Sequence, residues 1–293
     1  MKRFGAAMTL PVQAPYRLDL TADALRRLAS NVVDVIGADG TLYRALQDER
    51  GAELVAVRSA GGAIEVRATG RNPERWLPAI ARMLGTQVDL KNWYARARTI
   101  PWLARLASSL RGLKPPRYPT LWEALAHSIL FQQISIHAAA AIMRRVVERL
   151  GTTVGLEEVR CVAFPPPQRW LDVSDAVLRE AGTSANKIAH LRSAAAAVVE
   201  GDISERELEQ LPTPEAALRL CAIRGIGPWS ASVVLLRGMG RLDTFPLRDS
   251  GVARSLALIS GEAQVDQNVL LERLGDVRGM LYYHLLLGRM RNL

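Results

Sequence analysis

The chain of 293 residues is long enough for about two domains at roughly 150 residues each, and its 49% of hydrophobic residues excludes a disordered protein. Its 38 Lys and Arg residues outnumber 29 Asp and Glu residues, and the formal net charge of +9 favours nucleic acid as a partner, ahead of an anionic membrane. Two cysteines, Cys161 and Cys221, are too few for an all-cysteine zinc site or an iron–sulfur cluster, and the four histidines lack metal-site spacing.

The first 90 residues mix strand and helix signals. Thr21 is typical of a helix N-cap, so we expect a helix over 22–36. Two short β-like runs flank Gly61-Gly62 and predict a hairpin. Asn72-Pro73 then predicts the start of another helix. An antiparallel sheet with helices on one face would bury this pattern, so residues 1–90 are expected to form an α+β domain.

From about residue 91 the β signal disappears, and we expect residues 91–293 to be all-α. A helix over 92–110 is interrupted near Pro101, Thr120 caps a very apolar helix with Glu123 three residues later, and Ser135 caps the next helix. Further helices are predicted over 174–181, 185–200, 214–224, 228–237 and after 249.

The segment 213–252 carries the clearest functional signal. Thr213-Pro214 starts a helix, Gly225-Ile226-Gly227 needs a tight turn, and Pro228 suits the first position of a second helix. Two helices joined in this way expose unpaired amides at a positive helix N-terminus, which is a site for a phosphate. The alternative is that the glycines only form an interhelical turn.

Three motifs together resemble a known family. Leu220, Ile223, Gly225-Ile226-Gly227, Trp229 and Ala231 are spaced as in the helix–hairpin–helix of the DNA glycosylase superfamily. The residues Asp243, Phe245-Pro246 and Asp249 resemble the loop and the aspartate that follow that motif, and Gln132-Gln133-Ile134-Ser135 resembles the superfamily's Q-Q-x-S segment. The chain is most similar to the bacterial 3-methyladenine DNA glycosylase II family.

This resemblance implies a mostly α fold with an α+β N-terminal domain: a small antiparallel-sheet domain precedes a helix–hairpin–helix glycosylase core. We expect the N-terminal domain at 1–90 and the core at 91–293. Within the core, one helical subdomain is expected at 119–230, with the hairpin motif at 214–238. A second helical subdomain is expected to combine 91–118 with 239–293.

The resemblance also implies base-excision repair, in which the enzyme flips a damaged base out of double-stranded DNA and hydrolyses its N-glycosidic bond. Asp249 aligns with the family's catalytic aspartate, which stabilises the positive charge that builds on the sugar. Its alternative role is the N-cap of the helix that starts at Ser250, and both roles can coexist. We expect Asp243 to be structural and to order the loop.

The DNA contacts follow from the same resemblance. The amides of Gly225, Gly227 and Trp229 are expected to anchor the phosphate backbone, and Gln133 is expected to act as the intercalating wedge with Gln132 beside it. The alternative for the glutamine pair is a polar helix break. No cofactor is expected except a structural Na⁺ or K⁺ ion, which would be held by the backbone carbonyls of Cys221, Ile223 and Ile226.

Alkylated purines such as 3-methyladenine and 7-methylguanine carry positive charge, which an aromatic pocket favours. The candidate pocket residues are Trp122, Phe131, Trp229 and Tyr282, although aromatic residues at helical spacing are more often core. Val233 and Val277 stand where the broad-specificity enzyme has aromatic residues. Trp229 replaces the nucleophilic lysine of bifunctional members, so we predict a monofunctional enzyme without lyase activity.

Several alternatives stay open from the sequence. Arg237 and Arg248 contact phosphates or form a solvated face. Rival functions are a glycosylase for oxidised or deaminated bases, a non-catalytic DNA-damage-binding protein and, more weakly, a transcription factor. No apolar run reaches 18 residues and the N-terminus is a weak signal peptide, so we expect a cytoplasmic, nucleoid-associated protein with no membrane partner. The resemblance implies a monomer.

Overall fold

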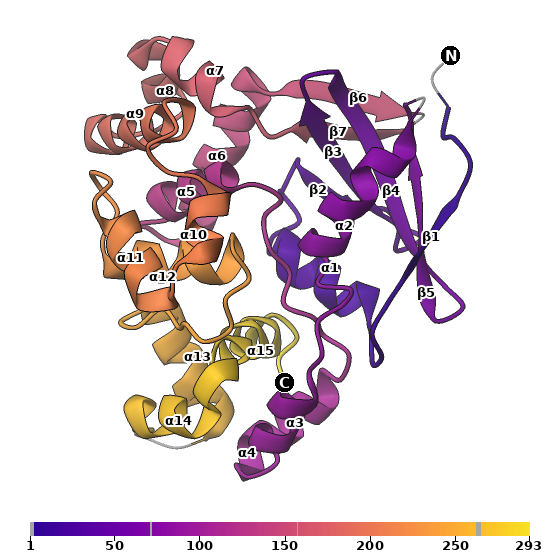
Figure 1. Ribbon diagram of the computed structural model, residues 1–293, viewed down its shortest axis with the longest axis vertical. Coiled ribbons are helices and arrows are strands. Elements are labelled where there is room, and N and C mark those ends of the chain that lie inside the picture. The colour runs from indigo at the N-terminus through magenta and orange to yellow at the C-terminus, as the bar shows by residue number, and fades with distance from the viewer. Residues whose placement is uncertain (1–2, 71, 157, 262–264) are drawn as a thin grey trace.

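A computed structural model describes residues 3–70, 72–156, 158–261 and 265–293. Its N-terminal part is a five-stranded antiparallel sheet in the order β1-β5-β4-β3-β2, which lies beside a large helical part (Figure 1). The strands are β1 (Met8–Pro11), β2 (Asp34–Ile36), β3 (Leu42–Asp48), β4 (Gly51–Ala60) and β5 (Ala63–Ala68). The expected α+β arrangement is therefore present, and the turn between β4 and β5 is the hairpin predicted at Gly61-Gly62.

One face of the sheet packs against helices. Leu42, Val55 and Val57 alternate along β3 and β4 toward this face and are fully buried. They contact α1 (Leu18–Arg26) and α2 (Leu77–Met83), which follows a short 3₁₀ turn, η1 (Pro73–Trp76). The helix predicted at 22–36 is thus wrong in extent: it begins after Arg17 and ends at Arg26, since residues 34–36 form the edge strand β2.

The other face of the sheet is covered by a hairpin that belongs to the second half of the chain. Strands β6 (Thr152–Leu156) and β7 (Val159–Ala163) pair with each other and lie beside the sheet (Figure 1). Val154 and Cys161 of this hairpin pack onto Leu54 of β4. The prediction that residues 91–293 are all-α is therefore wrong at this hairpin. The hairpin joins the two parts of the chain through apolar contacts.

The rest of the described chain is helical. Its helices are α3 (Lys91–Ala97), α4 (Pro101–Ser109), α5 (Leu121–Leu130), α6 (Ile136–Leu150), α7 (Pro167–Asp172), α8 (Asp175–Glu180), α9 (Ala185–Val199), α10 (Glu205–Gln210), α11 (Thr213–Cys221), α12 (Pro228–Arg237), α13 (Ser250–Ser260), α14 (Gln267–Leu274), η2 (Gly275–Val277) and α15 (Gly279–Met290). They bury two apolar clusters, one centred on α5, α9 and α12 and one on α3, α4, α13 and α15. None of the described helices combines the length and the apolar character needed to cross a membrane.

The predicted helix caps at Thr120 and Ser135 are confirmed. Thr120 accepts a hydrogen bond from the Glu123 amide, and Ser135 accepts one from the Ala138 amide. The carboxylate of Glu123 does not complete a capping box, because it is used elsewhere: its Oε2 accepts a bond from Nη2 of Arg44 at 2.6 Å.

Arg44 lies at the centre of a buried charged group between the sheet and the helices. It is 1% exposed and also donates from Nη1 to Asp34 of β2 at 2.5 Å. Removing one partner from such a group leaves an uncompensated buried charge, which costs about 3–5 kcal/mol. Asp34 and Glu123 therefore fix the edge of the sheet against α5.

Candidate functional site: a helix–hairpin–helix and a capping aspartate

The turn between α11 and α12 requires its first glycine. Gly225 has φ +89°, and a Cβ added there would lie 2.2 Å from Cγ of His190 on α9. Gly227 precedes α12 in an extended conformation with φ −96°, is exposed, and would meet nothing within 4 Å. The turn thus packs against the protein at Gly225 and opens to solvent at Gly227, where the first amides of α12 begin.

Gln132 holds this turn in place. Its side-chain nitrogen donates to the carbonyl of Gly225 and to the hydroxyl of Ser230, both at 2.8 Å. These two bonds join the end of α5 to both sides of the helix–hairpin–helix. Gln132 is therefore directed at the protein, which makes it a support for the turn.

Gln133, by contrast, is exposed and has φ +57° in the connection between α5 and α6. Its neighbour Ile134 is also exposed, at 39%. An exposed side chain on a left-handed residue at the tip of a short connection is free to enter a groove. The alternative for the pair, a polar helix break that bonds locally, therefore fits Gln132. It does not apply to Gln133, whose exposed side chain is still available as a wedge.

Asp249 and Trp229 are joined directly. Oδ1 of Asp249 accepts hydrogen bonds from the amides of Gly251 at 2.8 Å and Val252 at 3.0 Å and so caps α13. Oδ2 accepts a bond from the indole nitrogen of Trp229 at 3.1 Å. Three donors thus fix the orientation of a partly exposed carboxylate beside the first turn of α12, and the capping role coexists with access to solvent.

A small pocket of about 40 Å³, partly open to solvent, lies where the end of α1 meets α5 and α6. Phe131, one of the predicted pocket residues, lines this pocket and is the residue before Gln132 in the sequence. Other lining residues are Arg27, Tyr118, His127, Ile136 and Met143. Tyr282 on α15, also predicted, is bound to this wall because its hydroxyl accepts a hydrogen bond from Arg27.

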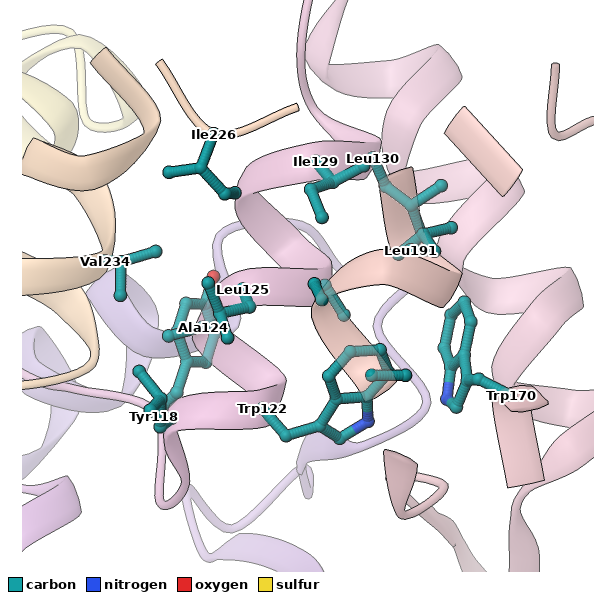
Figure 2. Close-up of a cluster of buried hydrophobic side chains, with 14 of the residues drawn as sticks. Tyr118, Trp122, Ala124, Leu125, Ile129, Leu130, Trp170, Leu191, Ile226 and Val234 are labelled. Atoms are coloured by element: carbon teal, nitrogen blue, oxygen red, sulfur yellow. The ribbon is translucent and has the colours of Figure 1, made fainter. Parts of the chain in front are cut away.

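Trp122 lies elsewhere. It is 4% exposed, donates from its indole nitrogen to the carbonyl of Pro165 at 3.0 Å, and meets the edge of Trp170 (Figure 2). Trp122 therefore belongs to the apolar core around α5 and does not line the pocket. This is the alternative given above, in which aromatic residues at helical spacing are core. Figure 2 also shows Ile226 of the hairpin directed into this core.

The arginine and valine candidates also differ in whether they are buried or exposed. Arg237 is fully buried, donates to the carbonyl of Ala24 at 3.3 Å and lies over the ring of Tyr118, so the prediction that it contacts phosphate or solvent is wrong. Arg248 is exposed and has φ +60° directly before Asp249. Val233 and Val277 are both buried.

Two histidines are held neutral. The pKa of His127 lies well below its usual value, first because the side chain is buried and then because Arg237, Arg27 and Arg44 surround it. Burial lowers the pKa of His284 to about 4, although its contact with the Met280 carbonyl opposes the shift. The imidazole of His127 therefore lies between these arginines and the buried carboxylate of Glu123, whose Oε1 is 4.0 Å from its Nε2.

Sequence reasoning missed Arg27. The residue follows α1 with φ +63° and reaches Tyr282, which is 255 residues away in the chain. The predicted helix over 22–36 placed it inside a helix, so its side chain had no expected direction. The sequence could have indicated the position of Arg27 only if it had shown that α1 ends at Arg26.

Comparison with known proteins adds the following. A family model described as HhH-GPD superfamily base excision DNA repair protein matches residues 126–275, which is half of the chain. A DNA-3-methyladenine glycosylase of Bacillus subtilis is 29% identical over 171 residues, which are 58% of this chain and 56% of that protein. The match therefore spans little more than half of that relative's length.

Solved structures extend the likeness in fold to the whole chain. The 3-methyladenine DNA-glycosylase from Archaeoglobus fulgidus superposes with a TM-score of 0.82 at 24% identity, over 98% of this chain and 99% of that one. The 3-methyladenine DNA glycosylase of Schizosaccharomyces pombe in complex with abasic DNA has a TM-score of 0.55 at 22% identity, over 68% and 98%.

Proposed function

The chain belongs to the HhH-GPD superfamily of base excision DNA repair proteins, and on that premise we propose that it is a monofunctional DNA glycosylase for alkylated purines of the 3-methyladenine and 7-methylguanine type. The observation that carries the proposal is the carboxylate of Asp249, which is fixed by Trp229 beside the helix–hairpin–helix turn. The name of the Bacillus subtilis relative supports the substrate class.

Asp249 would act on the sugar. Breaking the bond between C1′ and the purine nitrogen builds positive charge on the sugar, which a nearby carboxylate stabilises. The bonds from Gly251, Val252 and Trp229 hold both carboxylate oxygens before substrate arrives, so little reorganisation is needed. The same carboxylate can orient the attacking water.

Trp229 argues for hydrolysis alone. An indole cannot attack C1′ and form a Schiff base, as an amine can. Its ring nitrogen already donates to Asp249, so the residue positions the carboxylate. The product would be an abasic site in an unbroken strand.

The hairpin and the α5–α6 connection would hold the DNA. The amides at Gly225, Gly227 and Trp229 would bind the phosphate backbone, and Gln133 would fill the gap left by the flipped base. A Na⁺ or K⁺ ion held by the carbonyls of Cys221, Ile223 and Ile226 would reinforce the phosphate contact. The turn fits such an ion in part, because the Ile223 carbonyl accepts from the Ile226 amide and keeps one lone pair.

The decisive experiment measures base release from methylated duplex DNA by the wild type and by Asp249→Asn. We expect the wild type to release 3-methyladenine and 7-methylguanine and the variant to be slower by about 100-fold or more. Strand breaks are expected only after alkali, and no borohydride-trapped adduct is expected. Asp243→Asn is the matched control, because Asp243 lies on the same loop, is exposed and bonds none of the described residues. The expectation that Asp243 orders the loop is therefore wrong.

The outcomes separate the candidate functions. Equal loss in both variants would indicate a damaged loop and remove the role of Asp249. DNA binding without release of methylated bases would contradict the alkylpurine assignment. Release of oxidised or deaminated bases in the same assay would then identify the rival glycosylase, and its absence a damage-binding protein. Within this proposal the protein acts as a monomer at the cytoplasmic nucleoid.

A further inference from the structure

The pocket beside Phe131 already contains a cation. The guanidinium carbon of Arg27 lies 5.7 Å from the ring centre of Phe131 and 5.9 Å from that of Tyr282. Both distances fall within the range of a cation–π contact. The two rings that were candidates for binding a cationic base are therefore in contact with an arginine of the protein itself.

Arg27 is held in this position from two sides. It follows the last residue of α1 with a left-handed backbone, and its amide donates to the carbonyl of Asp23. Its Nη2 donates to the hydroxyl of Tyr282 on α15. The side chain thus crosses from the N-terminal part of the chain to the helical part and forms part of the pocket wall.

One donor of Arg27 is unused. Its Nε is buried and has no hydrogen-bond acceptor among the described residues. A buried donor without a partner is unfavourable, and a ligand that supplies an acceptor would relieve this. The unused donor therefore favours a ligand with an exposed oxygen or nitrogen acceptor.

The surroundings also disfavour a further cation. His127 lines the same pocket, and its pKa lies well below the usual value, first because the side chain is buried and then because Arg237, Arg27 and Arg44 lie near it. Arg44 is paired with Asp34 and Glu123, whereas Arg27 and Arg237 have no carboxylate partner among the described residues. A purine methylated at N7 or N3 would bring such a cation into the pocket.

We propose that Arg27 is a specificity-determining residue that weakens the preference of the base pocket for cationic purines over neutral damaged purines with an acceptor, such as hypoxanthine. The proposal rests on the proposed glycosylase function and on the flipped base entering the pocket beside Phe131. Arg27 would act in two ways: it occupies the face of Phe131 that a cationic base would use, and it donates to the base.

The chemistry of the leaving base agrees with this role. When the bond from C1′ to N9 breaks, its electron pair stays on the purine and water supplies the oxygen at C1′. The proton that water loses goes to the base when the base leaves as an anion, and to solvent when the base leaves as a neutral molecule. A cationic purine leaves as a neutral molecule and needs no help, whereas a neutral purine leaves with negative charge. A guanidinium that donates a hydrogen bond stabilises this charge and keeps its own proton.

The test compares single-turnover release of 7-methylguanine and of hypoxanthine by the wild type and by Arg27→Gln. We expect the variant to raise the rate ratio of 7-methylguanine to hypoxanthine by about ten- to a hundredfold, the effect of one like charge a few ångströms away. Arg27→Met keeps the length of the stem on the same rings and gives the same ratio if Arg27→Gln does not fold. Arg58→Gln is the charge control, because Arg58 pairs with Glu65 on the exposed surface.

The result can fail in two separate ways. A ratio that stays within about threefold in both Arg27 variants overturns this inference and leaves the glycosylase function intact. A wild type that binds the duplexes and releases neither base overturns the proposed function, and the inference falls with it. A changed ratio in Arg58→Gln would assign the effect to net charge and also overturn the role of Arg27.

Discussion

The indole nitrogen of Trp229 lies 3.1 Å from Oδ2 of Asp249, so the first turn of α12 holds the carboxylate that begins α13. The hairpin motif and the candidate catalytic group are therefore parts of one arrangement. A shift of the hairpin would move the carboxylate as well.

Trp229→Phe should slow base release with little effect on DNA affinity. The change removes the bond to Asp249 and keeps an aromatic ring, and a bond of about 1 kcal/mol corresponds to about a fivefold loss of rate. Single-turnover kinetics would measure it. Trp76→Phe removes a similar indole–carboxylate bond, to Glu53, from the N-terminal part and should leave the rate unchanged. Equal rates for wild type and Trp229→Phe would refute the positioning role.

Gly225→Ala should destabilise the protein, and Gly227→Ala should not. An alanine at Gly225 would need a left-handed backbone and would collide with His190, at a combined cost of about 2–5 kcal/mol. At Gly227 the added methyl group meets nothing. Urea unfolding of the two variants would measure the difference. Similar unfolding free energies would show that the turn has other ways to accommodate Gly225.

The two adjacent glutamines should separate stability from activity. Gln132→Ala leaves the Gly225 carbonyl and the Ser230 hydroxyl without their donor and should lower the free energy of unfolding by about 1–3 kcal/mol. Gln133→Ala should change it by less than about 0.5 kcal/mol. Base release by Gln133→Ala should nevertheless fall by about tenfold or more, because the flipped state loses its wedge. Normal release by Gln133→Ala would exclude this residue as the wedge.

His284 should make stability depend on pH. Its folded pKa of about 4 lies below the usual 6.5, so the unfolded chain binds the proton more readily and acid favours unfolding. Between pH 7 and pH 5 this group should remove about 2 kcal/mol of stability, and the loss should continue toward pH 4. His284→Gln should be less stable at pH 7 and should show a shallower decline. Contributions from His127 are present in both proteins and cancel in the comparison.

Local features were predictable from the sequence. The caps at Thr120 and Ser135 depend on side chains that bond an amide three residues on, and the break before Pro101 depends on the missing amide of proline. The hairpin glycines were likewise predictable from their local pattern, and Asp249 was identified through the resemblance to the family. The contacts of these residues were not predictable. Trp229 and Asp249 are 20 residues apart, and their contact depends on the path of the loop between them.

Long-range features were missed for a physical reason. The β6–β7 strands are short, and they are stabilised by packing on β3 and β4, about a hundred residues earlier in the chain. Strand preference depends on such neighbours more than helix preference does. Arg27 was missed in the same way, since Tyr282 and Phe131 give its side chain a direction that no local pattern contains.

The β6–β7 hairpin also limits how evolution can rearrange this protein. A chain that began near residue 91 would keep the hairpin but expose Val154 and Cys161, and it would leave Glu123 buried without Arg44. A chain that stopped near residue 90 would expose Leu54 instead. An exchanged N-terminal part would therefore keep these contacts only if it were another sheet with a small apolar face and an arginine in the same place.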